Sequence, residues 1–285
     1  MIPKYTIPSD YEQLTSVCRL AKLRWNSILI KFRLYVSIEP LNDDAESEID
    51  VNRAFKFIRQ NELLFAVARE VRDIYSYIEG TRRGTFSQHG EDTFIQARFG
   101  NKKEGFYVDV GASHPFRISN TFLLYKSGWR GVTVEPIPLF GHLHRRWRPQ
   151  DIFVQKAISP VPCKLRFYEM LPSVLSTLDP KTAKASELED KAQLLRSYEI
   201  DVITLGQLFA DYVGERIVDL LSVDIEGLDA DTITTFELHT IRPRVICIEA
   251  NHIDCRNRIL TYLEHYNYRP VAELGVNLIF ENALE

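Results

Sequence analysis

Residues able to bind a ligand stand at the ends of short apolar runs in the second half of the chain. Asp109 and Gly111 follow the run Phe106–Val108, and Glu135 ends the next run, Gly131–Val134. In open α/β sheets, ligands bind outside the carboxyl ends of the strands, where a glycine lets the backbone approach the ligand. A carboxylate at the end of the second strand can accept two hydrogen bonds from a ribose diol. The three residues together predict a site for a ligand that carries a ribose.

The turn after Gly111 lacks the glycine fingerprint of dinucleotide-binding proteins. Ser113 occupies the position of the second glycine, and no residue fits the third. Because those glycines let the backbone approach a pyrophosphate, their absence disfavours a nicotinamide-dependent oxidoreductase. A tight strand-to-helix turn that binds no ligand is the alternative interpretation of this segment.

The elements that must position these residues are short strands that alternate with helical segments after Thr85. Several of the runs are almost continuously apolar, as expected for parallel strands that are covered on both faces. Strand–helix alternation of this kind predicts a doubly wound α/β fold with a mostly parallel sheet and right-handed crossovers. The last two runs flank a turn at Gly275 and predict an antiparallel pair. The predicted strands are Gly105–Val110, Gly131–Glu135, Ile152–Ile158, Leu220–Ile225, Val245–Glu249, Arg269–Ala272 and Val276–Phe280.

Six motifs in this half of the chain, in this order, resemble the FkbM family of methyltransferases. They are Ser87-Gln-His-Gly-Glu-Asp92, Asp109-Val-Gly-Ala-Ser-His-Pro115, Ser119-Asn-Thr121, Gly128-Trp-Arg-Gly131, Glu135-Pro136 and Val223-Asp-Ile-Glu-Gly227. The resemblance covers about residues 85 to 280 and does not extend to the first 84. It implies a class I methyltransferase (Rossmann-like) fold with a seven-stranded sheet, S-adenosylmethionine as the methyl donor, and methyl transfer to a hydroxyl oxygen.

Carried over position by position, the resemblance implies a donor site along one edge of the sheet. The methionine end of the donor would be lined by Asp109, Gly111 and Ser113, its ribose held by Glu135, and its adenine flanked by Ala157 and Ile158. Gln88 and Glu91 would cover the donor, and Asp224 would face it. Many members of the family carry Asn and Gly where this chain has His114 and Pro115, which makes the binding turn less flexible here.

Methyl transfer to oxygen also calls for a base, because the acceptor hydroxyl must lose its proton. A positioned base contributes about 10²–10⁴-fold to the rate. Asp224, after the strand Leu220–Val223, and His252, beyond the next strand, are the candidates. A capping or surface histidine is the alternative for His252, and Glu226 is interpreted as an anchor of its loop. A divalent metal held by Asp224, Glu226 and Glu249 is an alternative that the sequence does not favour, although hard oxygen ligands suit magnesium.

Residues 1–84 predict a helical extension that precedes the methyltransferase domain at residues 85–285. Apolar residues recur at helical spacing from Leu14 to Val36 and from Asn52 to Ile78, and a glycine-flanked hinge, Gly80–Gly84, follows. Basic residues separate the apolar positions of the first helix. Packing of the apolar stripe on a partner, including homo-oligomerisation, is favoured over attachment to a membrane surface.

Charge and composition limit the expected partners and compartment. The formal net charge of −4 disfavours a nucleic-acid binder. The basic run His142-Leu-His-Arg-Arg-Trp-Arg148 predicts a solvated helix face, with contact to an anionic acceptor as the alternative. No stretch approaches the ~18 apolar residues of a membrane span, and the first ten residues lack a signal-peptide layout. With four cysteines and no Cys-x-x-Cys pair, we expect a cytoplasmic protein with reduced thiols.

The sequence therefore predicts an O-methyltransferase that uses S-adenosylmethionine and acts on a small molecule. A sugar or glycan acceptor is expected from the family alone, because no residue encodes it. A nicotinamide-dependent oxidoreductase and a binding protein that keeps the fold without catalysis are the alternatives.

Overall fold

The computed structural model describes residues 62–100, 102–189, 191–225 and 227–284, apart from the side chains of residues 62–66, 68 and 174. The chain divides into two compact units, Met1–Tyr75 and Ser76–Glu285. The helix predicted from Leu14 to Val36 lies outside the described residues, as does the first part of the pattern from Asn52 to Ile78. The rest of that pattern forms helix α4 (Glu62–Arg83).

The predicted hinge at Gly80–Gly84 differs from the observed structure. Helix α4 continues through Gly80, where a β-carbon would lie only 2.6 Å from the ring of Phe86. The chain leaves the helix at Gly84, whose φ of 74° is a left-handed conformation that favours glycine. The hinge is therefore confined to the residue that ends the helix.

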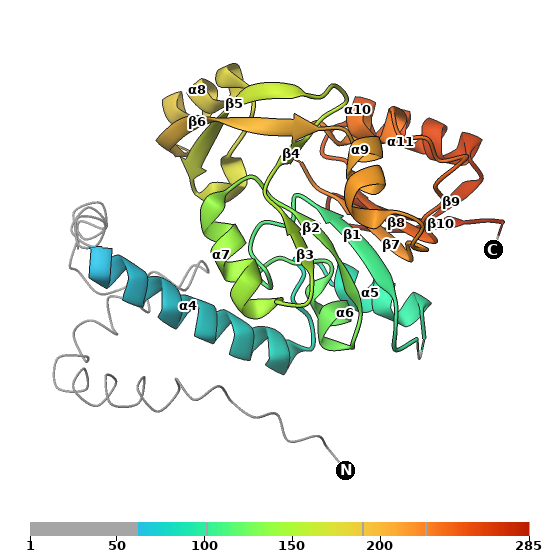
Figure 1. Ribbon diagram of the computed structural model, residues 1–285, viewed down its shortest axis with the longest axis horizontal. Helices are drawn as coiled ribbons and strands as arrows, with labels where there is room; N and C mark the ends of the chain where they lie inside the picture. Colours follow the sequence, from blue (N-terminus) through green and yellow to red (C-terminus); the bar gives the residue numbers. More distant parts are fainter. Residues whose placement is uncertain (1–61, 101, 190, 226, 285) are drawn as a thin grey trace, which may run out of the picture. The chain divides into compact units, whose positions relative to one another are not determined.

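The second unit is built on a seven-stranded, mostly parallel sheet, which confirms the predicted doubly wound class I methyltransferase fold (Figure 1). The strands lie in the order β3-β2-β1-β7-β8-β10-β9, and only β10 and β9 join the sheet in antiparallel pairs. The predicted antiparallel pair around Gly275 is thereby confirmed. The strands are β1 (Phe106–Val110), β2 (Arg130–Val134), β3 (Ile152–Val154), β7 (Leu220–Val223), β8 (Val245–Glu249), β9 (Tyr268–Leu274) and β10 (Asn277–Asn282).

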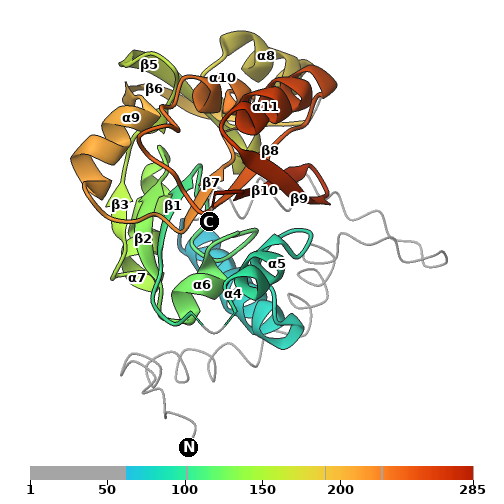
Figure 2. The ribbon, with the colours of Figure 1, turned by 90° about the vertical axis from the view of Figure 1, so that its right-hand side faces the viewer.

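Helices cover both faces of this sheet, as Figures 1 and 2 show. Helices α5 (Glu91–Arg98) and α6 (Phe122–Lys126) pack Ile95 and Leu124 against Tyr107 and Cys247 on one face. The larger core on the other face joins alternate strand residues such as Val108 and Ile248 to a second set of helices. These are α9 (Leu205–Leu208), the π-helix Phe209–Val213, α10 (Asp229–Thr234) and α11 (Ile253–His265). Burial on both faces explains why the central strands are apolar throughout.

A second, three-stranded sheet departs from the prediction. The run Ile152–Ile158 is not one strand, because it divides between β3 and β4 (Ala157–Ile158), which belong to different sheets. Strand β4 pairs with β6 (Gln193–Ile203), which forms a long antiparallel pair with β5 (Cys163–Leu171). The 3₁₀ turn Ser173–Leu175 and helix α8 (Pro180–Leu188) connect β5 to β6. This β5–β6 arm packs Phe167 and Tyr198 against helix α7 (Pro138–Trp147).

Among the helices that the structure describes, none is both long enough and apolar enough to cross a membrane.

Candidate functional site

The carboxyl ends of β1 and β7 are in direct contact, which brings Gly111 and Asp224 together as the sequence predicted. A β-carbon placed on Gly111 would lie 1.7 Å from the backbone carbonyl oxygen of Asp224. Gly111 also has φ 78°, a conformation that side chains rarely adopt. Its amide donates to the carbonyl of Val134 at the end of β2, at 3.0 Å. Only glycine allows three strand ends to meet here, so its first role is to close the sheet edge.

Glu135, at the end of β2, is buried, although a carboxylate at the end of a strand is usually exposed to solvent. It is 5% exposed, and its two oxygens accept the backbone N–H groups of Ser113, at 3.0 Å, and Ile137, at 2.8 Å. Ser113 adopts a left-handed φ of 45°, which aims its amide at Glu135. Burial raises the pKa of Glu135 to about 7, and the two N–H bonds partly oppose this. Each carboxylate oxygen retains a second lone pair, so the residue fits a ribose diol.

Asp109 takes part in a buried network that the sequence did not reveal. Its carboxylate accepts from the hydroxyl of Thr121 and lies 3.8 Å from the guanidinium of Arg148. Arg148 also donates to Asp151 at 2.7 Å, and the hydroxyl of Tyr107 donates to the same Asp151 oxygen at 2.7 Å. Burial raises the pKa of Asp109, and the neighbouring Arg148 opposes the rise. Asp109 therefore joins β1 to the loop before α6 and to the residue that follows α7.

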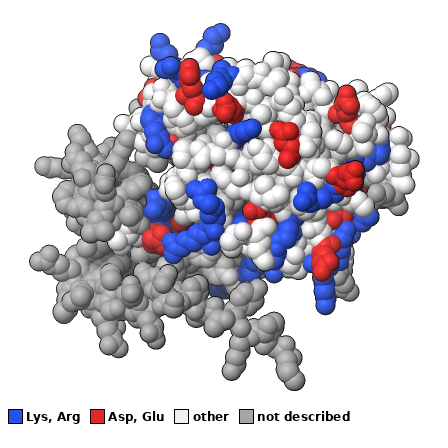
Figure 3. Space-filling model, in the orientation of Figure 1, with Lys and Arg blue, Asp and Glu red and all other residues white. Residues whose placement is uncertain are grey.

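The predicted basic face from His142 to Arg148 is only partly correct. His142, Arg145 and Arg146 are exposed, but Arg148 is 1% exposed and His144 is also buried. The imidazole of His144 bonds to the carbonyl of Ser113 at 3.0 Å, and burial lowers its pKa well below the ordinary range. Basic and acidic side chains are interspersed on the face of the molecule in Figure 3. The run thus separates into a solvated part and a part that supports the Ser113 turn.

His114 and Pro115 shape that turn from within. His114 is 2% exposed, and its Nδ1 accepts the amide N–H groups of Phe116, at 3.4 Å, and Arg117, at 3.3 Å. Its ring also packs edge-on against Phe116. These contacts give a physical basis for a rigid turn at this position.

The segment that enters the domain is bonded to the start of β10, beside the carboxyl end of β8. Glu91 is fully buried and accepts the amide of His89, at 2.8 Å, and the side-chain amide of Asn277, at 2.9 Å. Gln88 is exposed. At the other side of the site, Ala157 and Ile158 are buried in β4.

An acidic cluster lies at the ends of β7 and β8. Carboxylate oxygens of Asp224, Asp229 and Glu249 lie within 4.8 Å of one another. Asp229, which the sequence analysis missed, accepts the amides of Ile225, at 2.9 Å, and Gly227, at 3.1 Å. Asp229 thus anchors this loop. Glu226, for which the same role was predicted, lies outside the described residues. An acidic residue in the first turn of a helix that follows a glycine was the available signal.

The members of this cluster differ in their burial and in the groups that act on their pKa values. Burial raises the pKa of Asp229 to about 7, and Glu249 adds to the rise. Burial also raises the pKa of Glu249, while bonds with Asn251 and Asp224 oppose it. Asp224 is partly exposed. His252 is exposed at the N-cap of α11, where its side chain makes no capping hydrogen bond.

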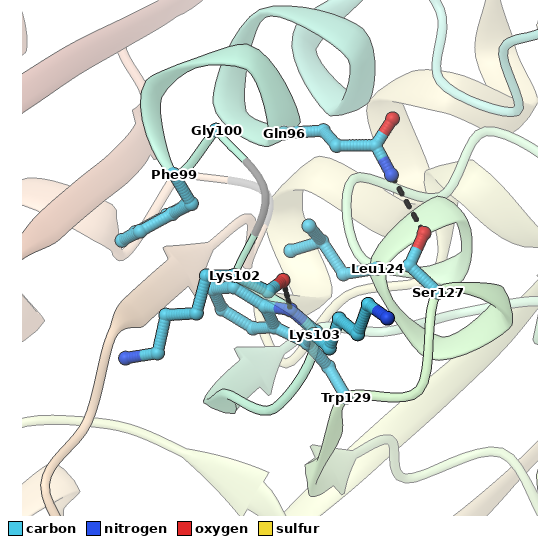
Figure 4. Close-up of a pocket in the computed structure, with 8 residues that line it drawn as sticks. All are labelled: Gln96, Phe99, Gly100, Lys102, Lys103, Leu124, Ser127 and Trp129. Atoms are coloured by element: carbon cyan, nitrogen blue, oxygen red, sulfur yellow. Dashed lines mark hydrogen bonds between the residues drawn. The ribbon is translucent and has the colours of Figure 1, made fainter.

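A hollow of about 420 Å³ lies away from this edge (Figure 4). It is lined by residues that precede β1 and by the turn between α6 and β2. Gln96 donates to Ser127 at 2.6 Å, and the Trp129 indole donates to the carbonyl of Lys102 at 3.0 Å. These residues lie at the amino ends of the strands, so the hollow is separate from the predicted site.

Comparison with known protein families finds one match, to the methyltransferase FkbM domain, over residues 109–270. This range is more than half of the 285-residue chain and includes the ends of β1, β2, β7 and β8. Among curated proteins, no relative matches the chain.

Several solved structures are similar at low identity. A TehB-like SAM-dependent methyltransferase from Corynebacterium glutamicum shares 13% identity over 75% of this chain and 98% of its own, with a TM-score of 0.37. The Burkholderia thailandensis 1,6-didemethyltoxoflavin-N1-methyltransferase was solved with 1,6-didemethyltoxoflavin and S-adenosylhomocysteine. It shares 10% identity over 85% of this chain and 93% of its own, with a TM-score of 0.35. The C-terminal domain of precorrin-6Y C5,15-methyltransferase from Rhodobacter capsulatus shares 12% identity over 67% of this chain and 86% of its own, with a TM-score of 0.36. Similarities of this size say nothing about the acceptor of this chain.

Proposed function

Because the chain belongs to the methyltransferase FkbM family, we propose that it transfers a methyl group from S-adenosylmethionine to a hydroxyl oxygen of a small molecule, with a sugar or glycan as the acceptor. The observation that carries the proposal is the meeting of Gly111, Glu135 and Asp224 at one edge of the sheet. Strand ends at this edge are where open α/β sheets bind their ligands.

The donor half of the site is assigned to β1, β2 and β4. Glu135 is the proposed ribose ligand, since both of its oxygens are already oriented by backbone N–H groups and keep free lone pairs. The buried pair Ala157 and Ile158 supplies an apolar surface for adenine. Asp109, Gly111 and Ser113 line the methionine end, and Gln88 and Glu91 belong to the covering segment. When bound, the donor supplies an electrophilic methyl group on a sulfonium.

The chemical half of the site is assigned to the ends of β7 and β8. Much of the acceleration of such a displacement can come from aligning the acceptor oxygen with the methyl carbon. Asp224 is the first candidate for the base that receives the hydroxyl proton, and its partial exposure and the contact of its backbone with Gly111 support this assignment. The exposed His252, at the start of α11, is the second candidate for the base.

The nicotinamide-dependent alternative is less consistent with the observed turn. The Ser113 amide, which would otherwise be available to a pyrophosphate, donates to Glu135. A binding protein without catalysis would share the donor site and lack turnover.

Calorimetry and a transfer assay test the proposal together. The full chain is titrated with S-adenosylmethionine and with NAD, and then incubated with methyl-labelled donor and a panel of polyhydroxylated acceptors. We expect saturable binding of S-adenosylmethionine, no binding of NAD, and label in an acceptor ether. NAD binding would establish the oxidoreductase, and donor binding without transfer to any acceptor class would favour the binding protein.

A further inference from the structure

The acidic cluster at the ends of β7 and β8 brings three carboxyl groups together. Its members are Asp224, Asp229 and Glu249, with ligand oxygens within 4.8 Å of one another. Asp229 is 4% exposed and Glu249 is 8% exposed. Burial raises the pKa of Asp229 and of Glu249; Glu249 adds to the rise at Asp229, and the exposed His252 opposes it at Glu249. Buried carboxylates at this separation repel each other unless a proton or a cation intervenes.

Unsatisfied oxygens in the same place point to a ligand. The Oε2 atom of Glu249 is buried and has no hydrogen-bond partner. The Oδ1 atom of Asn277 is also buried without a partner, and Asn277 is paired with Glu249 across the β8–β10 ladder. Residues paired in this way project from the same face of the sheet. The Asn277 amide cannot be reversed to relieve this, because its nitrogen donates to Glu91 at 2.9 Å.

A proton on one carboxyl group would relieve part of the repulsion, whereas a cation would relieve it and also bind the free lone pairs of several oxygens at once. Carboxylate and amide oxygens are the ligands that hard divalent cations prefer. Asp229 can join them, because each of its oxygens accepts one backbone N–H and keeps a second lone pair. We propose that Asp224, Asp229 and Glu249 bind one divalent cation of the magnesium or manganese class.

The position of the cation suggests what it would do. The backbone of Asp224 contacts Gly111, so the cluster adjoins the proposed donor site. A cation there would bind an acceptor hydroxyl and lower its pKa. In that arrangement Asp224 is a ligand, and His252 is left as the residue to accept the proton. This role depends on the proposed methyl transfer, whereas binding of the cation does not.

Manganese binding to the full chain tests the site without donor or acceptor. Electron paramagnetic resonance measures free Mn²⁺ during a titration, and Mg²⁺ is then added as a competitor. We expect one saturable site per chain that Mg²⁺ displaces. Glu249→Gln should weaken Mn²⁺ binding at least about tenfold. Glu169→Gln is the matched control, because Glu169 is a carboxylate of similar burial, 7% exposed, that is bonded to Arg196 in the β5–β6 arm.

The outcomes separate this inference from the proposed function. Circular dichroism checks that each variant is folded, and Asp224→Asn replaces Glu249→Gln if the latter does not fold, because Asp224 is partly exposed. Absence of saturable Mn²⁺ binding in the native chain, or unchanged binding in the folded ligand variants, overturns the cation site. Calorimetry with S-adenosylmethionine on the same samples reports the donor site independently. Mn²⁺ binding in a protein that never binds the donor would leave the cation site standing and reject the proposed function.

Discussion

The Asp109 network at the end of β1 and the acidic cluster at the ends of β7 and β8 handle buried charge in opposite ways. In the first, Arg148 stands between Asp109 and Asp151, and the side chains of Arg148 and Asp151 are at most 1% exposed. In the second, carboxylates face one another, and Glu249 keeps an oxygen without a donor. The first network pairs its charges within the protein, whereas the second leaves one oxygen of Glu249 unpaired and is the site of the proposed cation.

This difference separates structural from functional acids at one sheet edge. A buried charge is costly unless it is paired, and an uncompensated group in a native fold calls for a ligand or a catalytic role. By this reasoning, Asp109 mainly holds the donor half in shape, while Asp224 and Glu249 are available for chemistry.

The largest expected effect is on turnover in the Asp224→Asn variant. The amide keeps the shape of the side chain but cannot accept a proton as a base or act as a charged ligand. Turnover should fall about 10²–10⁴-fold, while donor affinity stays within about tenfold. Single-turnover assays and calorimetry measure the two quantities.

His252→Ala, assayed in parallel, decides which residue is the base. In a second experiment, a chelator is added to the native enzyme and magnesium is then restored. Loss of rate in His252→Ala, together with activity that falls with the chelator and returns with magnesium, indicates that Asp224 is a metal ligand. A parallel fall of donor binding and turnover in Asp224→Asn would instead make Asp224 a donor anchor. Full turnover in both variants contradicts both assignments. Alignment of the acceptor oxygen with the methyl carbon would then be the sole source of the catalysis.

Next in size is the stability of the Asp109 network. Arg148→Met removes the cation and leaves Asp109 and Asp151 buried without a compensating charge, so the free energy of unfolding should fall by about 3–5 kcal/mol. Arg146→Met is the control, because this exposed arginine should change it by no more than about 0.5 kcal/mol. Urea unfolding compares the two. Equal effects would show that the network is not the structural half.

Glu135→Ala tests the donor half directly. Loss of the proposed ribose ligand should weaken S-adenosylmethionine binding by roughly tenfold to several-hundredfold, about 1.4–3.5 kcal/mol. Because Glu135 also accepts two backbone N–H groups, the variant should lose stability as well, and binding is measured below its melting temperature. A folded variant with native affinity would remove Glu135 from the ribose site.

The pH dependence of stability gives the smallest effect. The pKa of Glu135 is raised from 4.5 to about 7, so between these values the folded state binds more protons than the unfolded state. The free energy of unfolding should therefore fall as pH rises from about 4.5 to about 7, by at most about 3 kcal/mol, and then level off. Glu135→Gln should remove this slope, while the similar contribution of Asp229 remains in both proteins. Urea unfolding at pH 5 to 8 gives the free energy of unfolding of both proteins as a function of pH. Parallel curves for the native protein and Glu135→Gln would contradict the prediction.

The mostly parallel sheet and the shared edge could be predicted from the sequence. Short apolar runs define parallel strands, and parallel strands end at one edge of a sheet, so Gly111, Glu135 and Asp224 had to lie near one another. Gly111 was recognisable because a strand-end glycine permits close approach, although the atom that approaches is the Asp224 carbonyl rather than a ligand.

Only the tertiary structure decided which charges are paired and which are left open. Arg148 looked like part of a solvated basic face, and its burial depends on Asp109 and Asp151 reaching it from other elements. Asp229 reaches the site because it bonds to the loop after β7, and Asn277 reaches it because it is paired with Glu249 in the antiparallel β8–β10 ladder. Periodicity and motif spacing are local properties, whereas burial and electrostatic compensation are sums over neighbours that are distant in the chain.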